Sequence, residues 1–189
     1  MIDEKTAREA VIRAADELFY TRGVQAVGMD AVRTAAGVSL KRIYSLFASK
    51  DELIVAVLHH RTAVWDSGLA SASERATSAR ERILAIFDFL DAWFREPDFR
   101  GCAFINTHGE LGAASTAVVD AVREQKRGFQ EYVAHLVSDA GAPAALAPQL
   151  AILAEGAQTT AAIAGTPEAA QQARAAAETL LDVATSRHA

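Results

Sequence analysis

Apolar residues recur at helical spacing along most of the chain. Val11, Ala15, Leu18 and Phe19 share one face of a first predicted helix, and Gly23 is a suitable residue to end it. No segment shows the alternation of apolar and polar residues that is typical of a strand, and no repeat of fixed period occurs. The pattern therefore predicts an all-α chain.

Two short helices are predicted next, at residues 29–36 and 40–47. Gly37 lies between them, where a positive φ suits glycine best. Ser39 can cap the second helix through its side-chain oxygen. Because the connection is so short, these two helices are expected to pack as a unit.

Longer helices are predicted in the rest of the chain. Ser49 and Glu52 form a capping box, which starts a helix expected to run to about Ser67 and to be followed by a loop over 68–77. A second capping box at 78–81 starts the next helix. A short helix is expected at 102–111, and a long helix that contains Val118 and Leu136 is expected to end at Gly141. The last two helices are expected from about Pro148 to Ala164 and from Pro167 to about Ser186, which gives about nine helices in all.

Composition agrees with a folded helical protein. Of 189 residues 42 are Ala, 11 are Gly and 4 are Pro, and 51% are hydrophobic, which favours helices around a buried core. Cys102 is the one cysteine, so an intramolecular disulfide is excluded and a reducing, cytoplasmic location is expected. The charged start predicts no export signal, and no apolar run approaches the roughly 20 residues of a membrane span.

Charge is unevenly distributed. The formal net charge is −5, but residues 1–60 carry eight basic and eight acidic side chains, so the deficit lies entirely in residues 61–189. Residues 39–50 contain Lys41, Arg42 and Lys50 and no acidic residue. A basic strip on a neutral head suggests that only this end meets a polyanion, although an ordinary solvated face has the same pattern.

The two short helices and their glycine turn are typical of a helix-turn-helix, whose second helix enters the major groove of DNA. In the segment 40–47, Ile43 and Phe47 lie four residues apart and are expected to pack inward. Lys41, Arg42 and Ser45 then point toward solvent or DNA. Arg42 is the best candidate for a base contact, because a guanidinium matches guanine O6 and N7 in a bidentate manner.

The same region resembles the N-terminal domain of TetR-family transcriptional regulators over residues 8 to 58. The resemblance is carried by Arg8, Val11, Ile12, Ala14, Ala15, Leu18, Phe19, Gly23, Val32, Ala36, Gly37, Val38, Ser39, Ile43, Tyr44, Phe47, Ser49, Lys50 and Leu53. It implies a helix-turn-helix DNA-binding domain at 1–48 and a helical effector-binding and dimerisation domain at 49–189. It also implies a homodimeric repressor that a small molecule releases from a palindromic, double-stranded DNA operator.

The resemblance further implies which residues touch DNA. Tyr44 and Lys50 are expected on phosphates, and the start of the 40–47 helix is expected to face bases. Gly28 replaces the Thr or Ser that often opens the preceding helix in this family, so its backbone N–H is the group expected near a phosphate. The predicted DNA-binding residues are Gly28, Ser39, Leu40, Lys41, Arg42, Tyr44, Ser45 and Lys50.

The last two predicted helices are rich in small residues, such as Ala151, Ala154, Ala169 and Ala173. Small faces let helices approach closely, so two such helices from each subunit would form a four-helix dimer interface. The alternative is that these faces pack only within one subunit. The prediction is a homodimer formed through the last two helices.

The middle of the chain holds most of the aromatic residues, with a few polar residues among them, as in a small-molecule site. The same pattern is also typical of an ordinary core. The predicted effector-binding residues are Trp65, Phe87, Leu90, Trp93, Phe94, Cys102, Phe104, Asn106, His108, Phe129 and Tyr132.

Other functions have weaker support. The sequence has no phosphate-binding loop, no dinucleotide fingerprint, no nucleophile elbow and no HExxH, so no catalytic residue, cofactor or metal site is predicted. Cys102 is interpreted as a structural residue more readily than as a redox sensor, since Arg100 is the one cation close to it in sequence. The alternative kept open is a helical small-molecule-binding protein or enzyme with no role in DNA binding.

Overall fold

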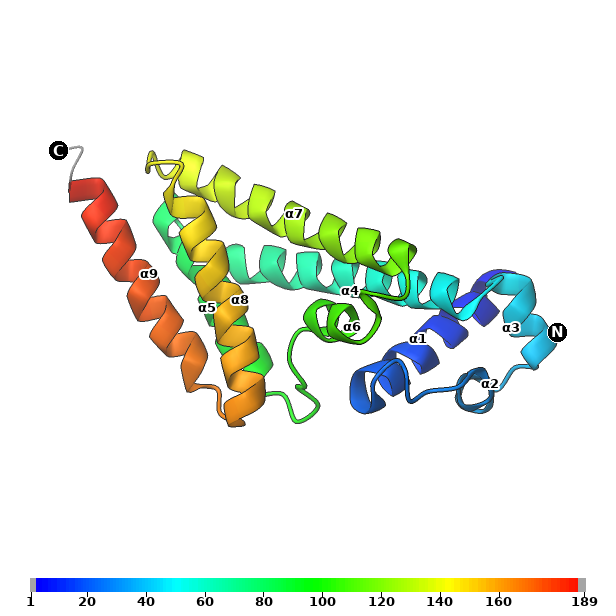
Figure 1. Cartoon of the computed structure of the whole chain (residues 1–189). Coiled ribbons are helices and arrows are strands. Elements are labelled where there is room, and N and C mark those ends of the chain that lie inside the picture. The colour runs from blue at the N-terminus through cyan, green and yellow to red at the C-terminus, as the bar shows by residue number, and fades with distance from the viewer. Residues whose placement is uncertain (1–2, 187–189) are drawn as a thin grey trace. The chain divides into compact units, whose positions relative to one another are not determined.

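The computed structural model describes residues 3–186, with the side chains of 185 and 186 left aside. This part of the chain forms nine helices and no strand, as predicted (Figure 1). The helices are α1 (Glu4–Arg22), α2 (Met29–Ala36), α3 (Leu40–Leu46), α4 (Lys50–Ser73), α5 (Ala79–Phe94), α6 (Ala103–Leu111), α7 (Thr116–Asp139), α8 (Leu146–Ala164) and α9 (Glu168–Ser186).

The chain divides into two compact units. The head unit comprises the described residues up to 63 together with 103–124, and so contains α1, α2, α3, the first part of α4, α6 and the start of α7. The body unit comprises 64–102 and the described residues from 125 onward. The boundary predicted between residues 48 and 49 lies inside the head unit.

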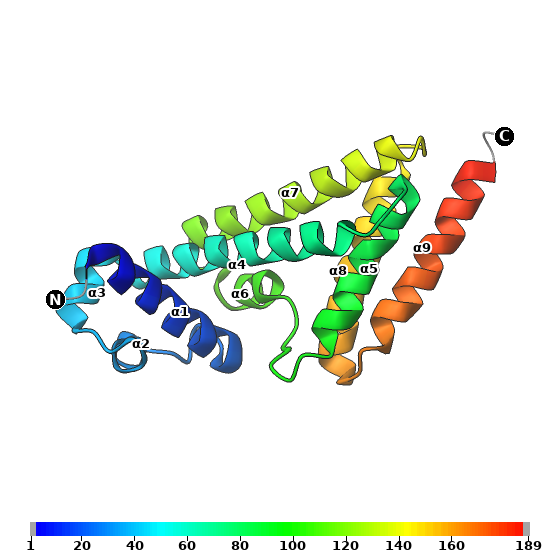
Figure 2. The same ribbon diagram turned by 180° about the vertical axis from the view of Figure 1, so that it is seen from behind.

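In the head unit, α1 packs against both α2 and α3 (Figures 1 and 2). Val11, Val32, Ile43 and Phe47 are completely buried and form the apolar contact between these helices. Arg8 on α1 donates a hydrogen bond to the carbonyl oxygen of Leu46 at 3.3 Å, and its guanidinium lies 4.4 Å from the centre of the Phe47 ring. These contacts fix the end of α3 against α1.

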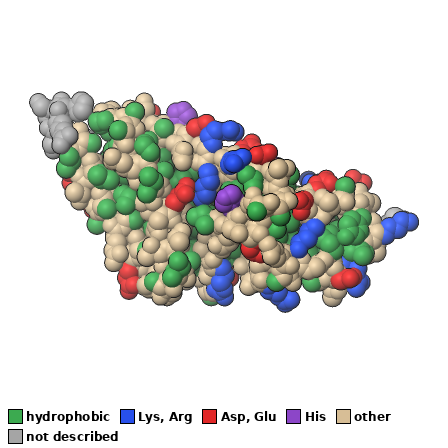
Figure 3. Space-filling model, viewed as in Figure 1, with side chains coloured by type: hydrophobic (Ala, Val, Ile, Leu, Met, Phe, Trp, Pro, Cys, Tyr) green, Lys and Arg blue, Asp and Glu red, His purple; other side chains and the backbone are tan. Residues whose placement is uncertain are grey.

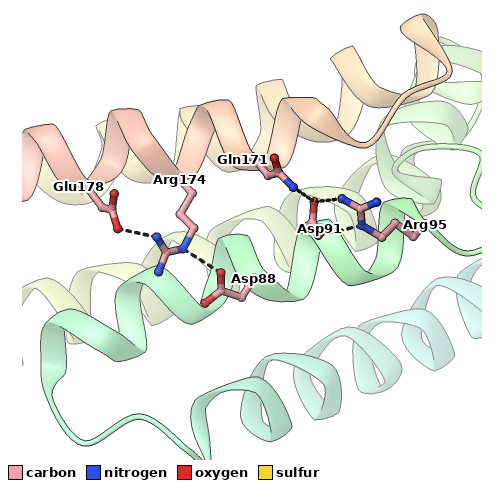
Figure 4. Close-up of polar contacts among 6 residues, drawn as sticks. All are labelled: Asp88, Asp91, Arg95, Gln171, Arg174 and Glu178. Atoms are coloured by element: carbon pink, nitrogen blue, oxygen red, sulfur yellow. Dashed lines mark hydrogen bonds and ion pairs between the residues drawn. The ribbon is translucent and has the colours of Figure 1, made fainter.

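In the body unit, α5, α8 and α9 pack on one another (Figures 1 and 2). A polar bond joins α5 to α9: Arg174 on α9 bonds to Asp88 on α5 at 2.8 Å, and within α9 the same arginine bonds to Glu178 at 2.5 Å (Figure 4). One turn away, Asp91 accepts hydrogen bonds from Arg95 at 2.9 and 3.0 Å and from Gln171 at 3.3 Å (Figure 4).

Both predicted capping boxes are present. The Ser49 Oγ accepts from the backbone N–H of Glu52 at 3.1 Å, and the Ser78 Oγ accepts from the backbone N–H of Glu81 at the same distance. In both boxes the glutamate reaches one residue further back than the standard pattern. Glu52 accepts from the N–H of Ala48 at 2.7 Å, and Glu81 accepts from that of Thr77 at 2.6 Å.

The predicted loop over 68–77 is wrong in its first half, because α4 continues to Ser73. Tertiary packing keeps this stretch helical. Leu69 is 4% exposed, and the hydroxyl of Ser73 bonds to the carbonyl oxygen of Leu69 and to the Tyr132 hydroxyl, which lies 3.2 Å away. Gly68 lies so close to Phe89 that a Cβ would approach that ring to 2.4 Å.

Candidate nucleic-acid interface

The turn between α2 and α3 has the geometry of a helix-turn-helix. Gly37 takes the left-handed conformation with φ 66° and ψ 27°, and its N–H donates to the carbonyl oxygen of Arg33. Two residues on, the Ser39 Oγ accepts from the N–H of Arg42 at 3.1 Å and caps α3. The predicted role of Ser39 as a helix cap is confirmed, and its contact with DNA stays a prediction.

Helix α3 has one face in the core and another in solvent. Ile43 is 0% exposed, whereas Tyr44 is 47% exposed and Lys41 and Ser45 are exposed as well. Leu40 and Arg42 are half-buried. The inward direction predicted for Ile43 is thus confirmed, and Lys41, Tyr44 and Ser45 lie on the solvent-facing side of the helix.

Two features of this helix bear on how it could meet DNA. The Ser45 hydroxyl donates to the carbonyl oxygen of Arg42 at 2.7 Å, so it can still accept a hydrogen bond but can donate one to DNA only by leaving this bond. No acidic residue lies in the first turn of α3, where Lys41 and Arg42 stand. No acidic side chain therefore offsets, within this first turn, the positive charge of Lys41 and Arg42 or of the helix N-terminus.

Gly28 precedes α2 as its cap residue and makes no side-chain cap bond. A Cβ at this position would have nothing within 4 Å, so the backbone is approachable there. The N–H groups at the start of α2 point out of the helix, as they do at every helix N-terminus. The geometry is compatible with the backbone phosphate contact predicted at Gly28.

Lys50 lies in a more enclosed place than its predicted phosphate contact requires. Its Nζ donates to the carbonyl oxygen of Val24 at 2.6 Å and lies 5.8 Å from the centre of the Phe19 ring. Partial burial lowers the pKa of this ammonium, while the charges of Glu110 and Asp51 oppose that shift. An ammonium has three N–H groups, so the bond to Val24 leaves capacity for a phosphate oxygen.

Glu110 makes structural contacts that the sequence pattern did not predict. Its carboxylate on α6 accepts from the backbone N–H of Val24 at 3.1 Å and from that of Gln25 at 2.8 Å. The Gln25 amide in turn donates to the backbone carbonyl of Glu110. We call these three bonds the Glu110 clasp. They fix the turn between α1 and α2, and no local signal could reveal partners 85 residues apart.

The structure divides the predicted effector-binding residues between the two units. Phe104, Asn106 and His108 belong to the head unit, with Phe104 buried and the other two exposed. The other eight belong to the body unit: Trp65, Phe87, Leu90, Trp93, Phe94, Cys102, Phe129 and Tyr132.

An aromatic cluster forms around Trp65 in the body unit. Its ring centre lies 5.3 Å from that of Phe89, 5.8 Å from that of Trp93 and 5.5 Å from that of Phe129, all with edge-to-face geometry. The indole Nε1 of Trp65 is buried and has no hydrogen-bond partner within the described residues, and the same holds for the side-chain oxygens of Gln125 and Gln158. The role of this cluster in effector binding stays a prediction.

Cys102 is buried, with 5% of its surface exposed. Lys126 Nζ lies 3.6 Å from its Sγ and 3.6 Å from a carboxylate oxygen of Glu155. Arg100, the cation close to Cys102 in sequence, donates to the carbonyl oxygens of Pro97 and Phe99. The described residues hold no group of three or more His, Cys, Asp or Glu side chains that could bind a metal ion.

The small-residue faces of α8 and α9 are buried within the subunit. Ala151 and Ala154 on α8 and Ala169 and Ala173 on α9 are all buried, and α8 packs on α9. Large apolar side chains remain outside: Ile152 is 71% exposed, Ile163 83% and Val183 49%. Hydrophobic side chains are spread over the surface of this part of the molecule, with few charged side chains among them (Figure 3). None of the described helices is long and apolar enough to cross a membrane.

A capped helix-turn-helix with a solvent-facing second helix, followed by a bundle of further helices, defines the class of DNA-binding transcriptional regulators. Family comparison agrees. Residues 11–57 match the model of bacterial regulatory proteins of the tetR family, and residues 79–177 match that of the tetracyclin repressor-like C-terminal domain. The chain belongs to the TetR family of transcriptional regulators, as the sequence resemblance predicted.

Solved structures show the same fold over nearly the whole chain. A TetR-family regulator from Streptomyces coelicolor is 26% identical with a TM-score of 0.88, over 95% of this chain and 96% of that one. A TetR-type regulator from Streptomyces avermitilis is 33% identical with a TM-score of 0.82, over 95% and 98%. The reduced form of Escherichia coli NemR, 23% identical, shares the fold with a TM-score of 0.83, over 92% of this chain and 95% of NemR.

A curated relative matches over a shorter stretch. The HTH-type transcriptional activator FasR of Mycolicibacterium smegmatis is 39% identical over 88 residues, which is 44% of this chain and 40% of FasR. Members of the TetR family are in general DNA-binding proteins that act as dimers and not as enzymes.

Proposed function

We propose that this protein is a homodimeric repressor that reads a palindromic DNA operator with α3 and releases it when a small molecule binds. The observation that carries the DNA-reading part is the division of α3 into a buried Ile43 and an outward group of Lys41, Tyr44 and Ser45. Such a helix can lie in the major groove without unpacking its own core.

Each side chain of this helix has its own part in the proposal. Arg42 is the base-reading residue, because a bidentate pair with guanine contributes roughly 1–3 kcal/mol of discrimination. Tyr44, Lys50 and the backbone at Gly28 bind phosphates and so set the position of the helix without reading sequence. Leu40 and Ser45 complete the surface that faces the bases.

The dimer in this proposal is formed by α8 and α9. Ile152, Ile163 and Val183 are exposed on these two helices. Covering such large apolar side chains with a partner surface removes them from water and stabilises the dimer. An isologous pair of such faces gives the twofold symmetry that a palindromic operator requires.

Effector release rests on the aromatic cluster around Trp65. Its buried indole N–H has no partner within the described residues and so offers a hydrogen-bond donor to a ligand among the aromatic rings. Activation of transcription is the second candidate, since the relative FasR is named an activator. A reporter fused to the regulated promoter separates the two: deleting the protein raises expression for a repressor and lowers it for an activator.

The DNA-reading residues are tested by fluorescence anisotropy with duplexes from the region flanking the gene. Arg42→Ala should lose most of the preference for the specific duplex over a scrambled one, while binding to scrambled DNA changes little. Arg127→Ala is the matched control, because this arginine is exposed on α7 in the body unit. An Arg42→Ala protein with undiminished preference would contradict the assignment.

A further inference from the structure

The head unit contains a cavity that the proposed effector site does not use. It has a volume of about 170 Å³ and is lined by residues 16–24 at the end of α1, residues 54–61 of α4 and residues 103–110 of α6. All three segments belong to the head unit. Of the residues predicted to bind an effector, Asn106 lines this cavity and the aromatic cluster around Trp65 does not.

The volume of the cavity and its apolar lining determine which ligand skeleton can fit. A cavity of about 150 Å³ accommodates one benzene molecule, so this one has room for a single ring with a small substituent. Phe19, Ile54, Val57 and Leu58 form the apolar wall and are each at most 6% exposed. Burying one ring against them removes apolar surface from water and stabilises the complex.

The charged groups at the cavity are already paired within the protein. Arg61 forms a hydrogen-bonded ion pair with Asp16, and its guanidinium lies 3.8 Å from the centre of the Tyr20 ring. The Glu110 carboxylate accepts from two N–H groups of the 24–25 turn. An anionic ligand would be repelled by the carboxylates of Asp16 and Glu110. A cationic ligand would have to compete for these carboxylates with Arg61 and with the backbone N–H groups that they already bond. An uncharged ligand avoids both costs.

Thr107 supplies an uncharged polar group on the wall formed by α6. It lines the cavity and is 5% exposed, and its hydroxyl can both donate and accept a hydrogen bond. A hydroxyl on the ligand is therefore the substituent that best suits this wall.

We infer that the head unit has a binding site of its own for a small, uncharged aromatic alcohol of the phenol class, between α1, α4 and α6. Because the ligand fits only when these helices stand as they do here, its binding stabilises this arrangement, the Glu110 clasp included. The inference concerns binding to the free protein, so it stands or falls without reference to DNA.

The test uses the full-length protein and three one-ring probes at pH 7: phenol, benzoate and benzylamine. Amide NMR shifts should saturate with phenol in the millimolar range and be largest within residues 16–24, 54–61 and 103–110. Benzoate and benzylamine should bind at least tenfold more weakly. An absence of saturable shifts, shifts centred elsewhere, or equal affinity for the charged probes would overturn the inference.

Two variants localise the site. Ala103→Phe places a ring at the cavity and should weaken phenol at least tenfold, whereas Ala117→Phe, at an exposed alanine of α7 in the same unit, should leave the affinity unchanged. Equal phenol affinity in Ala103→Phe would refute the site. If that variant does not fold, Thr107→Val decides: phenol should weaken severalfold and fluorobenzene should not, and undiminished phenol affinity would count against the inference.

Discussion

At the scale of single residues, the basic side chains of the head unit differ in how free they are. Lys41 is exposed on α3, Arg42 is half-buried there, and Lys50 is bonded to the Val24 carbonyl. Removing a side chain that both stabilises the fold and binds DNA should lower the stability of the protein and its affinity for DNA. Lys50 is the residue at which the two roles can be separated most cleanly.

Lys50→Met removes the ammonium and keeps an unbranched apolar stem beside Phe19. If Lys50 neutralises one phosphate in each subunit, the slope of log affinity against log salt should fall by about 0.9 for every phosphate that the variant leaves unneutralised. The measurement is DNA affinity by anisotropy at four salt concentrations, with Arg127→Met as control. An unchanged slope together with lowered stability would assign Lys50 to the fold alone.

The Glu110 clasp provides a second residue-scale prediction. Glu110→Ala leaves two backbone N–H groups without their charged acceptor, so the free energy of unfolding should fall by about 2 kcal/mol. Glu110→Gln keeps one acceptor oxygen and should lose about half as much. Urea denaturation measures both, with Glu124→Ala on the exposed side of α7 as reference. A Glu110→Ala midpoint equal to that of the reference would show that the clasp contributes nothing.

At the scale of elements, local sequence predicted most helix starts and ends. Capping oxygens at Ser39, Ser49 and Ser78 and the glycine at position 37 act within three or four residues of themselves, so spacing alone reveals them. The end of α4 could not be predicted in this way. The residues of its last turns are small or polar, which is typical of a loop. They stay helical because they pack against Phe89 on α5 and Tyr132 on α7, which are distant in sequence.

The candidate site followed the same division. Which residues of α3 face outward followed from the spacing of Ile43 and Phe47. The Val24 bond of Lys50, the Glu110 clasp and the Lys126 contact with Cys102 join residues 24 to 86 positions apart. The periodicity of the sequence cannot predict such pairs, because they depend on how complete helices pack together.

Asp91, near the end of α5, gives a prediction about pH. Hydrogen bonds from Arg95, and its charge, hold the pKa of Asp91 below its ordinary value, with a smaller part from Gln171 and some opposition from partial burial. The folded state therefore gains stability from this carboxylate above the pKa it has in the unfolded chain, about 3.9. That gain is lost as the pH falls through the lower, folded-state value.

Asp91→Asn should accordingly be less stable than the unmodified protein at pH 7, and the difference should shrink toward pH 2. The measurement is the urea midpoint across that pH range. Asp98→Asn, at an exposed position of the body unit, should show no such trend. A difference that stays constant with pH would mean that Asp91 acts through shape and not through its charge.

At the scale of the whole molecule, the proposed dimer depends on apolar side chains that the subunit leaves outside. Ile163→Asp places a charge on the most exposed of them and should shift sedimentation equilibrium at micromolar concentration from dimer toward monomer. Val64→Asp is the matched control, because Val64 is 59% exposed but lies on α4. A dimer that tolerates Ile163→Asp as well as the control would place the interface elsewhere.

Hydroxyl-radical footprinting of the ligand-free protein on the DNA flanking its gene tests the central claim most directly. The account predicts two protected half-sites related by inversion, with centres one helical turn of about 10–10.5 base pairs apart or a multiple of it. Uniform weak protection at low salt, with no pair of half-sites, would contradict the reading of DNA by paired α3 helices.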